Sequence, residues 1–152
     1  MILIIGASTG VGLKLALLSA HAGNDMILSS SSKEDLFPIK NHIESLYSVK
    51  VIVQEIDLSN LQNSVRKYKE KIEIFFPEIS SVYFLSGKLI DDSKYINLEE
   101  FKSVVDINFT SLAYLINEIL ENLPSNSFIV FASTVACIRA RNINTVYASA
   151  KK

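Results

Sequence analysis

The sequence has one cysteine and two histidines in 152 residues, which excludes two ways of stabilising a small protein. Cys137 has no second cysteine with which to close an internal disulfide. No cluster of cysteine and histidine occurs at the spacing that zinc requires. We therefore expect neither a disulfide scaffold nor a metal site.

The sequence also lacks an excess of charge and a long hydrophobic run. Lys and Arg number 15 against 16 Asp and Glu, for a net charge of −1, so the electrostatic attraction that drives nucleic-acid binding is missing. The first apolar run, "MILII", ends in "GASTG" and is far shorter than the ~20 residues of a membrane-spanning helix. It also lacks the basic start of a signal peptide. We expect a cytoplasmic protein with no nucleic-acid or membrane partner.

Apolar residues make up 49% of the sequence, and they fall into short runs separated by stretches with helical spacing. Such runs are typical of strands buried on both faces of a parallel sheet. One helical stretch covers residues 13–20, and another covers 101–112. The alternation predicts one α/β domain over residues 1–152, built as a doubly wound parallel sheet. The predicted strands are 2–5, 26–28, 51–53, 82–85 and 128–132.

A glycine-rich turn joins the first predicted strand to the first helix in "LIIGASTGVGLKLA". Gly6, Gly10 and Gly12 would allow a tight bend and the close approach of a diphosphate to the helix N-terminus. The spacing is G-x-x-x-G-x-G and differs from the general dinucleotide fingerprint. A dinucleotide site is the prediction, and a plain glycine-rich turn is the alternative.

Residues after the second and third strands bear on the choice of cofactor. No carboxylate occurs from Ser29 to Ser32, so nothing there repels a 2′-phosphate, and Ser30, Ser31 and Lys33 could bind one. NADP is therefore favoured over NAD, with a capped helix start and solvated serines as the alternative. Asp57 could accept the adenine amine, but spacing alone favours a turn or capping residue.

The ordered motifs of the chain resemble those of the short-chain dehydrogenase/reductase family over the whole length. They are "GASTGVG", "IDL" with Asp57, Gly87, "VVDIN" with Asn108, "FAST" and "YASAK". The resemblance implies a Rossmann fold with strand order 3-2-1-4-5. It also implies a nicotinamide cofactor and an oxidoreductase that transfers hydride to or from a carbonyl or alcohol substrate. Cofactor contacts carried over from the motifs are Gly6, Ser8, Thr9, Gly10, Val11, Gly12, Ser30, Ser31, Asp57, Leu58 and Gly87.

The closing helix carries Tyr147 and Lys151, whose spacing places both on one helix face. An ammonium beside a phenol stabilises the phenolate, which suits acid–base chemistry. In the family, the Tyr exchanges a proton with the substrate oxygen and the Lys also binds the nicotinamide ribose. The family's Asn, here Asn108, distorts its helix and holds a water that relays protons; a purely structural amide is the alternative.

The hydroxyl that polarises the substrate carbonyl has two candidates in "ASTVAC". Gapless matching to the family favours Thr134, and Ser133 stays as the rival. The family's usual Asn-Ala-Gly after the fourth strand is replaced by Leu85, Ser86 and Gly87, so cofactor contacts there are expected to differ.

Segments such as "SGKLIDD" resemble the subgroup of the keto-reducing partner in decaprenylphosphoryl-ribose epimerisation. This resemblance implies a keto-sugar substrate, and Arg139 and Arg141 could face an anionic group on it. Solvated loop arginines are the alternative.

The sequence ends at Lys152, inside the helix of Tyr147. Members of the family run on through two more strands, so we expect a C-terminally truncated chain with a frayed Tyr147–Lys151 pair and little or no activity. An open sheet edge would favour a homo-oligomer. The alternative function is a noncatalytic dinucleotide-binding or regulatory remnant.

Overall fold

The computed structural model describes residues 1–139 and 143–152; for residues 61–63 it describes the backbone only. Its sheet contains five parallel strands within the described residues, in the order β3-β2-β1-β4-β5. This order confirms the expected doubly wound topology. The strands are β1 (Ile2–Ile5), β2 (Met26–Ser30), β3 (Val51–Glu55), β4 (Ser81–Phe84) and β5 (Phe128–Phe131).

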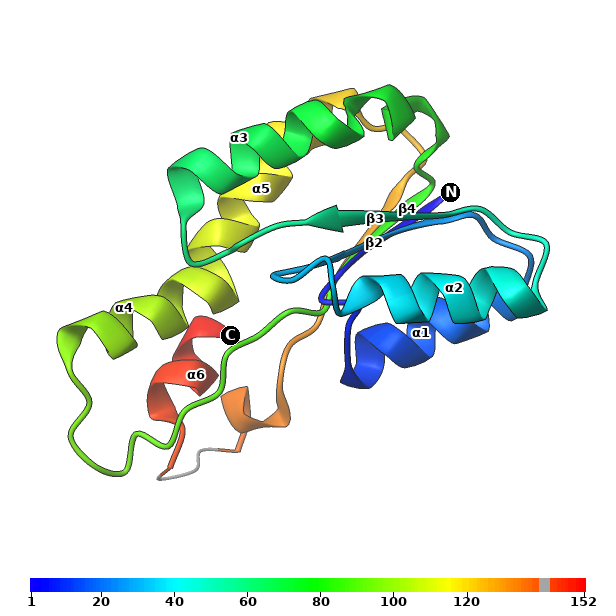
Figure 1. Cartoon of the computed structure of the whole chain (residues 1–152). Helices are drawn as coiled ribbons and strands as arrows, with labels where there is room; N and C mark the ends of the chain where they lie inside the picture. The colour runs from blue at the N-terminus through cyan, green and yellow to red at the C-terminus, as the bar shows by residue number, and fades with distance from the viewer. Residues whose placement is uncertain (140–142) are drawn as a thin grey trace.

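Helices cover both faces of the sheet (Figure 1). On one face, α1 (Gly10–His21) and α2 (Leu36–Leu46) pack over a core that includes Ile4 and Leu28. On the other, α3 (Leu61–Ile72) and α5 (Ser111–Ile119) enclose a core with Leu3, Phe84 and Leu115. The remaining helices are α4 (Leu98–Val105), α6 (Thr145–Ala150), and the short η1 (Glu73–Glu78), η2 (Asp106–Thr110), η3 (Leu120–Asn122) and η4 (Val135–Cys137).

The strands differ in burial, and this corrects one expectation. All of β1 is buried, as a central strand between two neighbours should be. In β5, however, Phe128, Val130 and Phe131 are exposed. The expectation of burial on both faces is wrong for this strand. Among the described strands, β5 pairs only with β4, so its other edge is open.

The predicted helix over 101–112 is interrupted by a π-helical segment. It begins earlier, at Leu98, where Asn97 and Glu100 form a reciprocal capping box. After Val105 the chain enters η2, a π-helical turn that contains Asn108, and then continues as α5. The π-turn frees a backbone carbonyl, and the Asn108 amide donates to that of Val104 at 2.8 Å. The resemblance to the family predicted such a distortion at Asn108.

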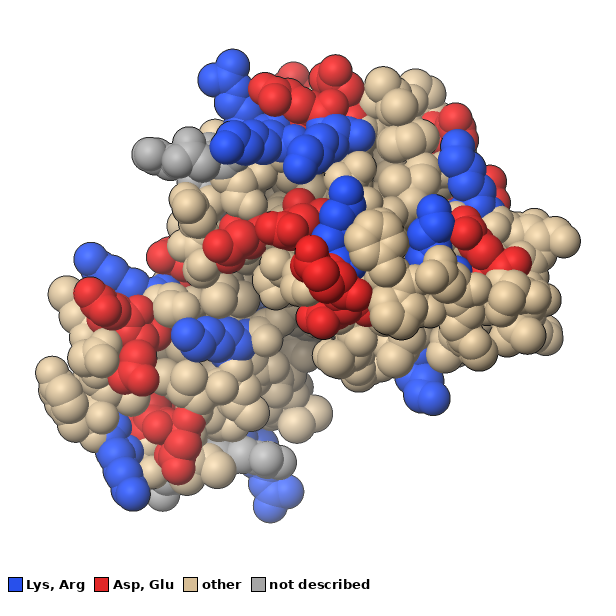
Figure 2. Space-filling view, viewed as in Figure 1, with Lys and Arg blue, Asp and Glu red and all other residues tan. Residues whose placement is uncertain are grey.

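No helix within the described ranges is long and apolar enough to cross a membrane. The same residues hold no group of three or more His, Cys, Asp or Glu side chains that could bind a metal ion. On the face shown in Figure 2, acidic and basic side chains alternate and form no broad patch of one sign.

Candidate functional site

A groove of about 590 Å³ lies at the carboxyl ends of the strands. It is the place where parallel α/β sheets bind ligands, because the strand order reverses there and leaves a crevice. In Figure 2 the surface is hollowed between the part that contains α4 and α6 and the part that contains α1 and α2. The predicted cofactor residues that line the groove are Gly6, Ser8, Thr9, Gly10, Val11, Ser30, Ser31, Asp57, Leu58 and Gly87.

The glycine turn between β1 and α1 depends on the absence of side chains. Gly6 and Gly10 have φ of 90° and 56°, which other residues rarely adopt. A Cβ on Gly6 would lie 2.5 Å from the backbone nitrogen of Ser86. Gly12 does not line the groove; a Cβ there would lie 1.9 Å from the carbonyl oxygen of Gly6. We therefore assign Gly12 a packing role that brings α1 close to the turn.

The N-terminus of α1 opens into this groove with its amide groups uncapped. Thr9 occupies the N-cap position, but its side chain makes no capping hydrogen bond. The first turn carries no acidic residue. Free N–H groups and the positive end of the helix dipole together favour an anion. The turn therefore fits a diphosphate.

The ends of β2 and β3 form the other part of the groove. Ser30 donates its hydroxyl to the carbonyl of Ser32 at 2.6 Å, so this hydroxyl proton is already used within the loop. Ser31 is exposed. Asp57 lines the groove and also accepts hydrogen bonds from the backbone and hydroxyl of Ser59, at 2.9 and 2.6 Å. Asp57 is thus both a turn residue and a groove residue.

A buried contact that sequence reasoning missed supports this region. Tyr68 on α3 is fully buried, and its hydroxyl lies 2.6 Å from that of Ser29 on β2. Burial raises the pKa of Tyr68 well above its ordinary value, because a phenolate there would lose its hydration, and the Ser29 hydrogen bond only partly opposes this. The Ser29 carbonyl accepts the N–H groups of Gly6 and Ala7 at 2.8 and 3.0 Å. Tyr68 therefore braces the strand that holds the glycine turn.

At the opposite end of the groove, Lys151, Asn108 and Gly87 come together. Lys151 is 9% exposed and donates from Nζ to the carbonyl of Ser86 at 2.7 Å. The Asn108 side chain bonds both the N–H and the carbonyl of Lys88, at 3.1 and 2.8 Å. A Cβ on Gly87 would lie 2.9 Å from Asn108 Oδ1 and 3.5 Å from Lys151 Nζ. The three predicted residues are therefore neighbours.

The environment of Lys151 affects its proton affinity. Burial lowers its pKa below the ordinary value, because the ammonium loses hydration, while the negative potential of Cys137 partly opposes this. The backbone carbonyl of Lys151 accepts the Ser133 hydroxyl at 2.7 Å. Thr134 Oγ1 instead accepts a hydrogen bond from the Ala136 N–H at 3.3 Å. Ser133 thus uses its hydroxyl proton on the backbone, whereas Thr134 acts there as an acceptor.

Tyr147 is partly buried on α6, and its backbone carbonyl accepts the Lys151 N–H at 3.1 Å. It is not among the residues that line the groove. Arg139 is exposed. Arg141 lies outside the described residues.

The short α6 is anchored by Asp92, a residue that the sequence motifs did not single out. Its carboxylate accepts the N–H of Val146 at 2.6 Å, and the N–H and hydroxyl of Thr145 at 3.0 and 2.9 Å. Burial opposes ionisation of Asp92, but these hydrogen bonds outweigh it and hold its pKa below the ordinary value. At the other end of α6, the Lys151 ammonium donates to the carbonyl of Ser86. Both ends of the helix are therefore held, and the structure does not show the fraying of Tyr147 and Lys151 that the short helix led us to expect.

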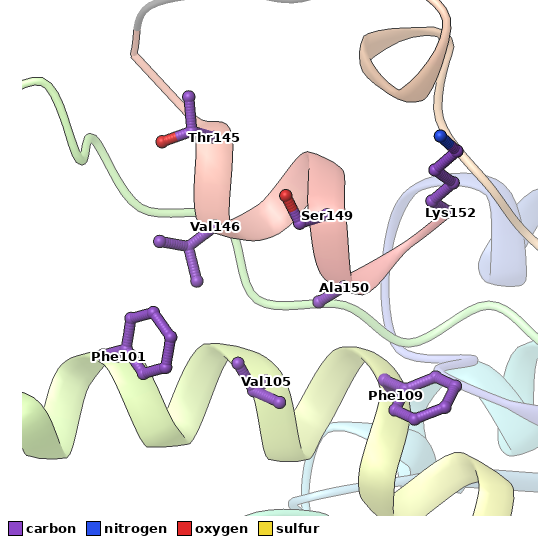
Figure 3. Close-up of a pocket in the computed structure, with 8 residues that line it drawn as sticks. All are labelled: Phe101, Val105, Phe109, Thr145, Val146, Ser149, Ala150 and Lys152. Carbon is purple, nitrogen blue, oxygen red and sulfur yellow. The ribbon is translucent and has the colours of Figure 1, made fainter.

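A second cavity, of about 500 Å³, lies between α4 and α6 (Figure 3). Phe101 and Val105 point from α4 toward α6, and Val146 points back toward them. Of the lining residues only Lys152 carries a charge. This mostly apolar cavity lacks a carboxylate and the glycine turn at a helix N-terminus that the groove has, so the groove is the candidate site.

A family model described as short chain dehydrogenase matches residues 1–152. The chain belongs to this family. The short-chain dehydrogenase/reductase aba4 of Botryotinia fuckeliana is 26% identical over 156 aligned residues, which cover 99% of this chain and 60% of that protein. The short chain dehydrogenase from Shigella flexneri superimposes with a TM-score of 0.89 at 24% identity, over 99% of this chain and 61% of that one.

An alcohol dehydrogenase from the archaeon Thermococcus sibiricus, solved with 5-hydroxy-NADP, superimposes on this chain with a TM-score of 0.87 at 21% identity. The match covers 99% of this chain and 65% of that one. The chain thus spans about 60% of the length of the relatives it matches. The matched part covers nearly all of this chain and therefore includes its five-stranded sheet.

Proposed function

We propose that this chain forms the dinucleotide-binding part of an NAD(P)-dependent oxidoreductase that acts on a carbonyl or alcohol. One observation carries the proposal: the groove begins at an uncapped helix N-terminus and reaches the backbone of Ser86 and Gly87, against which the Lys151 ammonium lies. A diphosphate fits the first end. At the second end, the buried ammonium of Lys151 is suited to support the acid–base chemistry of the reaction.

The cofactor we favour is NADP. Among the groove-lining residues only Asp57 carries a carboxylate, and it follows β3, not the loop after β2 where a 2′-phosphate would lie. Ser31 is exposed there, and Lys33 follows two residues later. The NADP analogue bound to the Thermococcus sibiricus structure is consistent with this choice. NAD is the alternative cofactor.

Each candidate catalytic residue has a distinct role in the proposal. A bound nicotinamide would supply or accept the hydride. Tyr147 would exchange the proton with the substrate oxygen, and Lys151 would stabilise the phenolate form of Tyr147. Thr134 would donate its hydroxyl to the carbonyl, since Ser133 already donates to the Lys151 backbone. Asn108 would hold the π-turn and support a proton relay to Lys151.

The substrate in this proposal is a small carbonyl or alcohol compound, with a keto-sugar as the specific candidate from the sequence resemblance. We also propose a homo-oligomer, because the β5 edge exposes Phe128, Val130 and Phe131. An unpaired strand edge with exposed apolar side chains favours association with another chain.

A noncatalytic dinucleotide-binding domain is the second candidate function. Two observations favour it. Tyr147 is not among the groove-lining residues, and Lys151 donates to a protein carbonyl within the groove wall. In this case the groove would bind cofactor without turnover.

Titration with NADPH and NADH, followed by assays of carbonyl-dependent oxidation, separates the two candidates. For an oxidoreductase, Tyr147→Phe should lower turnover by about 10²–10⁴-fold and leave cofactor affinity unchanged. Thr134→Val should impair turnover more than Ser133→Ala. If the chain binds cofactor but oxidises none with any carbonyl tested, residues 1–152 act by themselves only as a dinucleotide-binding domain. If it binds neither dinucleotide, both candidates fail.

A further inference from the structure

Three buried side-chain atoms in the described residues have no hydrogen-bond partner: Gln54 Oε1, Ser86 Oγ and Asn144 Oδ1. Of these residues only Ser86 lines the groove. A buried hydroxyl without a partner costs free energy, because it has lost its bonds to water and gained none in return. Such an atom in a binding groove suggests a ligand that supplies the missing partner.

The backbone of Ser86 is held from two sides, which fixes where its side chain can reach. On one side Ser86 packs against Gly6: a Cβ added to Gly6 would lie 2.5 Å from the Ser86 nitrogen and 2.7 Å from the Ser86 Cα. On the other side its carbonyl accepts the Lys151 ammonium at 2.7 Å. Ser86 therefore lies between the glycine turn, which fits the diphosphate, and Lys151, which would lie near the nicotinamide ribose.

We propose that the Ser86 hydroxyl binds the dinucleotide, donating its proton to an oxygen of the diphosphate or of the nicotinamide ribose. This inference rests on the proposed function. Ser86 already lines the groove, and a turn about its Cα–Cβ bond would bring the hydroxyl, which is buried in the free chain, toward a bound dinucleotide. The family's usual Asn-Ala-Gly places alanine here, so the contact would be a feature of this chain, with Leu85-Ser86-Gly87.

The test measures cofactor affinity and stability together, because the two move in opposite directions. Ser86→Ala should weaken NADPH binding by about tenfold, as expected for one hydrogen bond to a charged or polar oxygen. The same change should leave the melting temperature of the free protein unchanged or raise it, because it removes a buried hydroxyl that has no partner. Ser86→Cys, which keeps a side chain of similar size but is a weak donor, should also lose affinity.

Ser127→Ala is the matched control. The Ser127 hydroxyl donates to the carbonyl of Ile79 at 2.8 Å, just before β5 and at the opposite end of the strands from the groove. Its loss should lower the melting temperature of the free protein and leave NADPH affinity unchanged. A purely structural role for Ser86 would give this same pattern.

Parallel titrations with ADP, which carries a diphosphate without the nicotinamide ribose, identify the acceptor. If Ser86→Ala weakens ADP and NADPH binding alike, the acceptor is the diphosphate; if it weakens only NADPH binding, the acceptor is the ribose. Both results support the proposal. Equal NADPH affinity in Ser86→Ala and the unaltered chain overturns it and leaves the proposed function intact. If the unaltered chain binds neither NADPH nor NADH, the proposed function and this inference fall together.

Discussion

Replacing Gly12 with alanine should open the glycine turn, because the new Cβ would lie 1.9 Å from the Gly6 carbonyl oxygen. Real Cβ contacts below 3.0 Å essentially never occur, so α1 and the turn must separate by about 1 Å. Overpacking of this kind costs up to about 3 kcal/mol. Alanine regains about 1 kcal/mol of helix preference over glycine. We expect a net loss of about 2 kcal/mol in the free energy of unfolding.

Urea denaturation and NADPH titration of Gly12→Ala measure the two consequences. The shift of α1 moves its amide groups away from the diphosphate position, so NADPH affinity should fall by about tenfold or more. Gly23→Ala is the control: Gly23 has a positive φ, of 77°, which Gly12 lacks, but a Cβ there meets nothing within 4 Å. It should cost about 1 kcal/mol of backbone strain and leave affinity unchanged. Equal stability and affinity in the two variants would refute the reasoning.

Three other changes test the supports of the site. Asp92→Asn should reduce stability at pH 7 by about 1 kcal/mol. Because the Asp92 pKa is lowered in the folded state, its contribution is present above the ordinary value of 3.8 and is lost as the pH falls through the folded pKa. The stability difference between variant and unaltered chain, measured by urea denaturation, should therefore shrink as the pH is lowered below 3.8. Asn108→Ala removes three hydrogen bonds to the backbone and should cost about 3 kcal/mol; a loss below about 0.5 kcal/mol would contradict the assigned role. Tyr68→Phe leaves the Ser29 hydroxyl without its buried partner and should cost about 1–2 kcal/mol by thermal melting, and an unchanged melting temperature would argue against the brace.

The strands were predictable because each is a short apolar run between polar or glycine-rich segments. The predicted 2–5 agrees with β1, and the other four differ only at their ends. The exposure of β5 was not predictable, because an edge strand and a central strand have similar apolar sequences. Burial depends on which elements pack against a strand, and that is a property of the assembled fold.

The candidate site was predictable where a residue type is required by backbone geometry. Gly6 and Gly10 have positive φ, as the glycine-rich motif suggested. The contact of Gly87 with Lys151 was not predicted. Contacts between distant segments could not be predicted. Asp92 looked like any loop acid until the fold placed it at the start of α6, 53 residues further along the chain. Likewise, Ser86 is distinguished only by having no partner in a buried position.

The central claim is that a dinucleotide binds in the groove with its diphosphate at the N-terminus of α1. The most direct test is an NADPH titration of the ¹⁵N-labelled chain followed by the chemical shifts of its backbone amides. The account predicts saturable shifts at residues 6–12 and 86–88. Shifts concentrated around Phe101 and Val146, at the cavity between α4 and α6, would contradict it, as would no shifts at millimolar NADPH.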